Sequence, residues 1–159
     1  MDKSSPIDTR WRPRRLLLAP HRLAFFLAMA LLAASSLWWA LVLAQRVGVP
    51  LALPHAMAPS LVHAAVMVFG FMPLFFAGFL FTAGPKWLNV EPWPVSAIAA
   101  PLLLQAAGWL LWLAGAAWGD ALALAGCALA AVGLAWMTGL FLILLRRSAV
   151  PDRVHARCI

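Results

Sequence analysis

Charged residues are scarce in this sequence, and their scarcity decides the class of protein. Only 11% of the 159 residues are charged, and five of these are acidic, whereas 65% of the chain is hydrophobic. A soluble domain of this length needs far more polar side chains to cover its surface. The composition therefore excludes a soluble globular domain and indicates an integral membrane protein.

The residue patterns of soluble active sites are also missing. The sequence contains no Ser/His/Asp set, no paired carboxylates, no glycine-rich phosphate loop and no CxxC motif. Its two cysteines, Cys127 and Cys158, fall in an apolar run and in the C-terminal tail, so they form no disulfide framework. Whether the protein is an enzyme stays open on this evidence.

Four apolar runs, in contrast, are long enough to cross a bilayer. A hydrocarbon core of roughly 30 Å requires about 20 apolar residues in a helix. None of the four runs contains Asp, Glu, Lys or Arg. The sequence thus predicts an all-α integral membrane bundle of four transmembrane helices, at residues 23–44, 61–83, 95–118 and 121–145.

The basic residues flank these spans. Six precede the first span and four follow the last, with only Arg46 and Lys86 between them. The positive-inside rule then predicts a basic cytoplasmic tail at 1–22, a transmembrane domain at 23–145 and a second cytoplasmic tail at 146–159. The net charge of +7 is explained by contact with a lipid bilayer. A nucleic-acid partner is not expected, because the basic residues gather in short segments beside the membrane spans and offer no loops to hold a strand.

Prolines and glycines predict where the helices begin, bend and end. Pro20 suits the first turn of the first helix. Pro73 is expected to kink the second helix, with a neighbouring helix satisfying the carbonyl that it frees. Gly84 and Pro85 are expected to end that helix. The pair Gly119-Asp120 predicts a tight turn between the third and fourth helices.

Small residues in the last span predict close packing. Gly126, Ala130, Gly133 and Gly139 are spaced so that a neighbouring helix can approach their backbone. Gln105, in the third span, is the one strongly polar side chain in the middle of a run. The spacing indicates a bundle, and it leaves open whether further membrane helices or a second copy of the chain pack against it.

His63 is the main candidate for a functional residue, because an ionisable group within a span is costly to bury in lipid. Its helical face continues through Met67 and Gly70. A neutral imidazole here is a candidate ligand of haem iron or copper, with Met67 as a soft second ligand and Gly70 leaving room for a macrocycle. The alternative is an interfacial histidine bonded to a backbone carbonyl.

The other histidines are weaker candidates. His55 lies eight residues before His63 on the same outer side, so the two would meet on one metal if the loop folded inward. His21 lies at the opposite rim, where it would serve a second, cytoplasmic-side haem or simply sit among the headgroups beside Arg22. His155, in the C-terminal tail, is expected to be solvated or interfacial.

A longer pattern surrounds His63 in the stretch 61–87, LVHAAVMVFGFMPLFFAGFLFTAGPKW. It comprises His63, Met67, Phe69-Gly70-Phe71, Ala77-Gly78-Phe79-Leu80, Thr82-Ala83 and Pro85-x-Trp87. This pattern resembles the second-helix signature of the NnrS family, which has a His-Ala-His-Glu-Met run before its Phe-Gly-Phe. Ala65 and Val66 stand where that run has its second histidine and its glutamate.

The resemblance implies a function and cofactors. It implies a multi-pass protein of the bacterial inner membrane that takes part in the response to nitric oxide and nitrosative stress. Haem and copper are the implied cofactors, with His63, His21, His55 and Met67 as cofactor-binding residues and His63 with His55 as the metal pair. Members of the family have about twelve spans of about 20 residues each. The chain is therefore expected to be an N-terminal portion or a short relative.

Two other readings stay open. The chain would be a non-catalytic four-helix membrane subunit or assembly partner without a cofactor if its histidines are only interfacial. A transporter fragment is the third reading. It requires a polar path across the membrane, and Gln105 is the one strongly polar side chain in a span that supports such a path.

Overall fold

The computed structural model describes residues 13–150, and these residues form helices without any strand. Four helical rods are long and apolar enough to cross a membrane, as predicted. The second rod, Pro59–Leu88, is one continuous run of three helical segments. In chain order the segments are η1 (Pro13–Leu18), α1 (Pro20–Arg46), α2 (Pro59–Ala65), η2 (Val66–Phe71), α3 (Met72–Leu88), α4 (Val95–Trp118) and α5 (Asp120–Arg147).

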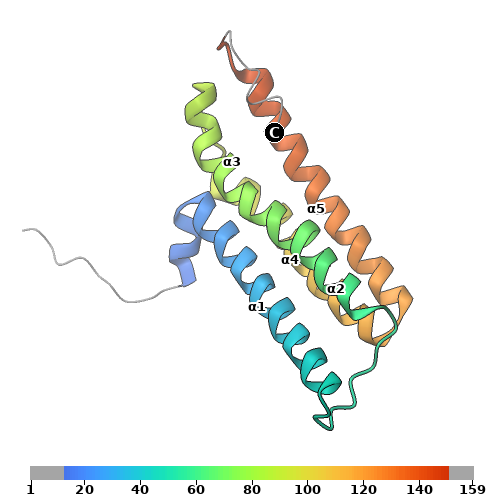
Figure 1. The fold of residues 1–159 in the computed structure, drawn as a ribbon. Helices are drawn as coiled ribbons and strands as arrows, with labels where there is room; N and C mark the ends of the chain where they lie inside the picture. Colours follow the sequence, from blue (N-terminus) through green and yellow to red (C-terminus); the bar gives the residue numbers. More distant parts are fainter. Residues whose placement is uncertain (1–12, 151–159) are drawn as a thin grey trace, which may run out of the picture.

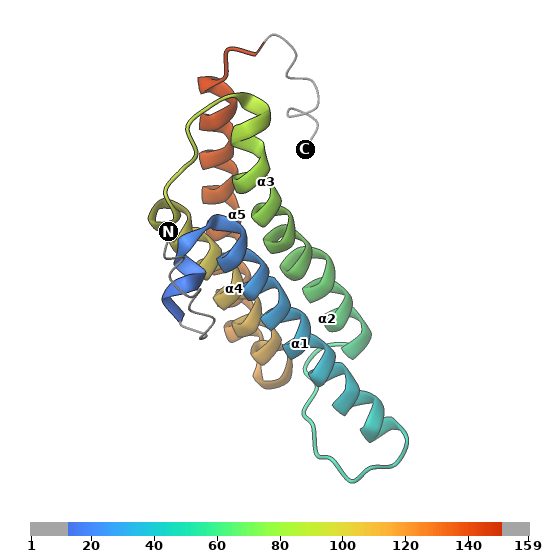
Figure 2. The same cartoon turned by 90° about the vertical axis from the view of Figure 1, so that its left-hand side faces the viewer.

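The rods alternate in direction, so α1 begins and α5 ends at the same end of the bundle (Figures 1 and 2). The loop after α1 and the turn before α5 lie at the other end. Arg46, the last residue of α1, is the one lysine or arginine of residues 13–150 at that second end. The segments η1, the start of α1 and the ends of α3 and α5 belong to the first end and carry Arg14, Arg15, Arg22, Lys86, Arg146 and Arg147. This asymmetry supports a cytoplasmic first end, which stays a prediction. Most of each predicted tail lies outside the described residues, including His155 and Cys158.

The helices α4 and α5 touch through their backbones. A Cβ atom added at Gly126 would lie 2.6 Å from the carbonyl oxygen of Gly108, and one added at Gly133 would lie 2.7 Å from the backbone nitrogen of Gln105. The predicted packing role of these two glycines is confirmed. Gly139 is different, because a Cβ there would meet no atom of residues 13–150 within 4 Å, so it makes no close helix contact within this part of the chain.

The connection between α4 and α5 is the single residue Gly119, as the predicted tight turn requires. Its φ of 148° and ψ of 155° are accessible to glycine and strained for other residues. The preceding loop, between α1 and α2, also docks on this end of α4. Its Ala56 backbone nitrogen donates a 2.9 Å hydrogen bond to the carbonyl of Ala116.

The end of α3 differs from the prediction. The helix does not stop at Gly84 and Pro85 but continues to Leu88. Pro85 removes one helical hydrogen bond without breaking the helix, and Asn89 ends it in a left-handed conformation, with a φ of 51°. Gly84 serves packing instead, since a Cβ there would lie 3.1 Å from the ring of Phe141.

The second rod departs from an α-helix at η2, a π-helical segment just before Pro73. Pro73 has no N–H group, so the carbonyl of Phe69, four residues earlier, loses its α-helical donor. Gln105 of α4 supplies a replacement, because its Nε2 donates a 3.0 Å hydrogen bond to the carbonyl oxygen of Phe69. The expectation that a neighbouring helix satisfies the carbonyl freed by Pro73 is thereby confirmed.

The π segment also sets which face of the second rod is buried. Val62, Val66, Gly70 and Leu74 are all buried. A straight α-helix turns about 100° per residue and would carry Leu74 about 120° away from the face of Val62. Each π turn contains more residues than an α turn, so residues spaced four apart drift less around the axis, and these four stay on one face. His63, next to Val62, therefore lies on the flank of the buried face.

Gly126→Ala is expected to lower the free energy of unfolding in detergent by about 1–3 kcal/mol, because its methyl group has no room between α4 and α5. Gly139→Ala, in the same helix, is expected to be neutral or stabilising by up to about 1 kcal/mol, since alanine is the better helix former. Thermal unfolding followed by circular dichroism measures both. Equal effects of the two substitutions would contradict the described packing of α5.

Candidate functional site

His63 is held against α1 by two contacts. Its Nδ1 lies 3.0 Å from the Oγ of Ser35, and its imidazole stacks on the indole of Trp39 with the ring centroids 5.3 Å apart and 12° between the planes. Ser35 and Trp39 are four residues apart on α1, so they lie on one face of that helix. Ser35 is fully buried and His63 is half-buried.

This geometry bears on metal binding. When Nδ1 carries the hydrogen it donates to the hydroxyl oxygen of Ser35, and Nε2 keeps its lone pair. Histidines that ligate metals almost always have one ring nitrogen fixed by such a hydrogen bond, which orients the ring and sets the tautomer. The pair His63 and Ser35 has this arrangement.

His55 lies at the same end of the bundle but contacts other residues. Its Nε2 is 3.0 Å from the Oε1 of Gln45, and its ring meets Trp38 edge-on with the centroids 6.3 Å apart. Both histidines thus contact α1, His55 through Trp38 and His63 through Trp39. They share no hydrogen-bond partner in the described part of the chain. Joint binding of one metal by this pair stays a prediction.

His21 lies at the opposite end of α1. Its Nδ1 is 3.4 Å from the Oγ1 of Thr82, and its ring is tilted against Phe25 with the centroids 6.1 Å apart. His21 and Ser35 are separated by about 21 Å along α1, at about 1.5 Å per residue. A ligand on His21 therefore belongs to a second site and not to the site of His63.

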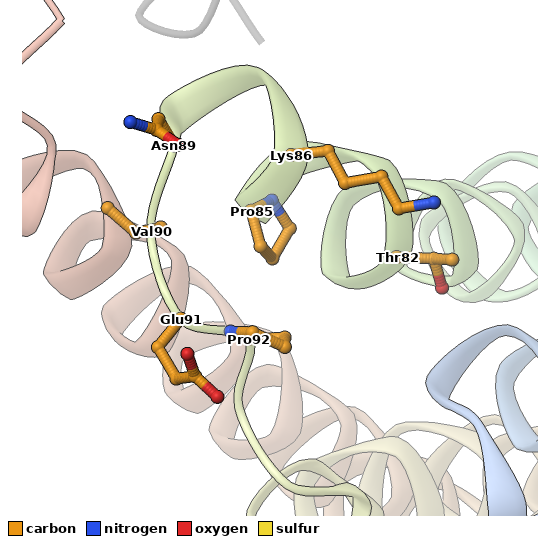
Figure 3. A pocket seen from close by; sticks show the side chains of 7 residues that line it. All are labelled: Thr82, Pro85, Lys86, Asn89, Val90, Glu91 and Pro92. Atoms are coloured by element: carbon orange, nitrogen blue, oxygen red, sulfur yellow. The ribbon is translucent and has the colours of Figure 1, made fainter.

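Two cavities adjoin the hydroxyl partner of His21. One has a volume of about 430 Å³ and is drawn with its seven lining residues in Figure 3. The other has a volume of about 640 Å³ and shares Thr82, Glu91 and Pro92 with the first. In Figure 3 the side chain of Lys86 runs toward Thr82, while Glu91 points away on the far side of Pro92. Space for a ligand thus exists beside Thr82.

The wall of these cavities is a short, fixed loop between α3 and α4. The indole Nε1 of Trp93 donates to the carbonyl of Leu140 at 3.1 Å, and Arg147 lies over the same indole, 4.2 Å from its centroid. The hydroxyl of Ser148 donates to the carbonyl of Leu88 at 2.8 Å. These contacts hold the loop against α5, so the residues that line the cavities are fixed in position.

Met67 and Gly70 fall in the π segment. Met67 is half-buried, like His63. Gly70 does not leave space for a macrocycle, and that expectation was wrong. A Cβ at Gly70 would lie 2.7 Å from the side chain of Leu31 and 3.0 Å from Cγ of Trp109, so α1 and α4 already fill the position.

The donors of residues 13–150 do not gather into a multidentate centre. No three of the His, Cys, Asp and Glu side chains in this part of the chain form a group that could hold a metal ion. The residues present offer single histidines, of which His63 and His21 each lie at hydrogen-bond distance from a hydroxyl of another helix. Sequence analysis missed these hydroxyl groups, Ser35 and Thr82, although a polar residue inside an apolar span was the signal that marked them.

Four apolar rods, with histidines bonded between helices at both ends, define a multi-pass α-helical membrane protein. The model of the family described as NnrS protein matches residues 15–157, nearly the whole chain. The chain belongs to the NnrS family. No curated protein and no solved structure matches it.

Ser35→Ala is expected to lower the free energy of unfolding by about 0.5–1.5 kcal/mol, because Nδ1 of the half-buried His63 loses its hydrogen-bond partner. Ser36→Ala is the matched control. Ser36 is exposed, so its replacement is expected to change stability by less than about 0.5 kcal/mol. Thermal unfolding in detergent compares the two variants, and an equal response would remove the evidence for the hydrogen bond between His63 and Ser35.

Proposed function

We propose that the protein binds haem at His63 and acts in the bacterial response to nitric oxide. The observation that carries the proposal is the hydrogen bond between Nδ1 of His63 and Ser35, because an imidazole that carries its hydrogen on Nδ1 keeps Nε2 as a ligand. Membership of the NnrS family supports the same function.

The donor chemistry fits haem better than copper. Haem iron requires only one axial ligand from the protein, and a neutral imidazole is the usual one. Copper sites are built from several nitrogen and sulfur ligands. Within residues 13–150, no three side chains of His, Cys, Asp or Glu lie close enough together to hold a metal ion. A copper ion would therefore depend on His63 with His55 or Met67, or on ligands from another chain.

The roles of the residues follow from their contacts. In the proposed tautomer Ser35 accepts the Nδ1 hydrogen of His63, which leaves the Nε2 lone pair for a ligand. Trp39 stacks on the ring and limits its rotation. A bound haem would supply an iron centre that binds nitric oxide. Whether the protein reduces, binds or senses nitric oxide is a separate question from how this iron would be held.

His21 is proposed as the ligand of a second haem at the other end of the bundle. Thr82 fixes its Nδ1, and the cavities of about 430 and 640 Å³ lie beside Thr82. This end carries most of the basic side chains, which would attract haem propionates. We also propose that this end faces the cytoplasm and that the bilayer is the bacterial inner membrane.

The test is the visible spectrum of the purified chain in detergent after addition of haem. The wild-type protein is expected to show a Soret band that His63→Ala weakens strongly. Ser35→Ala is expected to lower haem affinity by about 10–100-fold, the usual effect of removing the hydrogen-bond partner of a ligating histidine.

His55→Ala is the control, because His55 is bonded to Gln45 and not to the partners of His63. It is expected to keep the band that depends on His63. No Soret band in the wild type, or equal haem affinity in wild type and His63→Ala, would refute haem binding at His63. His63 would then be an interhelical contact in a membrane subunit without a cofactor.

A further inference from the structure

Two buried polar atoms on α4 have no hydrogen-bond partner among residues 13–150. They are Oε1 of Gln105 and Nε1 of Trp109. Gln105 is 1% exposed and Trp109 is 9% exposed, so neither atom reaches solvent or lipid headgroups. One atom accepts hydrogen bonds and the other donates them, so their requirements are complementary.

The orientation of the Gln105 amide is fixed by chemistry. The carbonyl oxygen of Phe69 can only accept, so the group 3.0 Å from it must be the Nε2 of Gln105. The amide oxygen is then turned away from Phe69. It cannot be satisfied by flipping the amide, because the flip would place two oxygen atoms against each other.

Gln105 and Trp109 both contact Phe69 of η2. Gln105 bonds the carbonyl of Phe69, and the indole of Trp109 stacks on the ring of Phe69 with the centroids 6.4 Å apart. Cγ of Trp109 is also 3.0 Å from the position that a Cβ of Gly70 would take. Because the two side chains are one helical turn apart on α4, they lie on one face of that helix. They do not bond each other.

We propose that Gln105 and Trp109 form a binding site for one water molecule inside the bundle. The water accepts a hydrogen bond from Nε1 of Trp109 and donates one to Oε1 of Gln105. A single water commonly bridges buried polar groups that lie too far apart for a direct bond. The ligand must both donate and accept, which nitric oxide cannot do because it has no hydrogen.

The site has a structural reason to exist. Pro73 frees the carbonyl of Phe69, Gln105 turns its nitrogen to that carbonyl, and its oxygen is then left for another donor. The water completes this chain of hydrogen bonds in a region where lipid offers none. The proposal stands independently of haem binding.

The experiment uses the full-length protein in detergent micelles, labelled with ¹⁵N at tryptophan. The indole signal of residue 109 is assigned as the one that disappears in Trp109→Phe. Magnetisation transfer from water to this indole proton is then measured. We expect a water cross-peak in the wild type and its loss in Gln105→Leu, with the indole signal itself retained.

Trp112→Phe is the matched control, since Trp112 is 8% exposed, lies on the same helix and packs against Trp109. It is expected to keep the water cross-peak of Trp109. Absence of the cross-peak in the wild type, or an equal cross-peak in Gln105→Leu, would overturn the proposal. The wild-type spectrum decides alone if Gln105→Leu does not fold.

Discussion

A backbone carbonyl inside a bilayer needs a hydrogen-bond donor, and Pro73 takes the donor of Phe69 away. Most of the features that position the site follow from the way the bundle meets this requirement. Gln105 reaches across from α4 to the freed carbonyl, and the rod widens into a π segment just before the proline. The buried amide of Gln105 thereby fixes how the second rod is placed along α4 and which of its faces is turned toward α4.

That rotation determines what His63 contacts. The π segment keeps Val62, Val66, Gly70 and Leu74 in the core, so the imidazole of His63 lies at the edge of the buried face and against α1. There it meets a buried hydroxyl and an indole, which fix its ring. A histidine pointing to lipid would have no such partner, and a fully buried one would have no room for a ligand. The proposed role of His63 depends on this intermediate position.

Local features of the chain could be predicted from the sequence, and features made by contacts between helices could not. The four spans, the start at Pro20 and the turn at Gly119 depend on residues close together in the chain, and all three are confirmed. Pro85 was expected to end α3, but the helix continues to Leu88, and Gly84 lies against Phe141 of α5, a contact that no local pattern indicates. The partners of His63 and His21 lie 28 and 61 residues away, beyond the reach of any local pattern.

The central claim is that Ser35 holds His63 in the form that leaves Nε2 free to bind a metal. Nitrogen NMR of the protein labelled with ¹⁵N at histidine, before cofactor is added, tests it most directly, because a protonated and an unprotonated ring nitrogen have widely separated shifts. The account predicts that Nδ1 of His63 is protonated and Nε2 is not, and that Ser35→Ala mixes the two forms. A wild-type spectrum with the hydrogen on Nε2 would contradict the account.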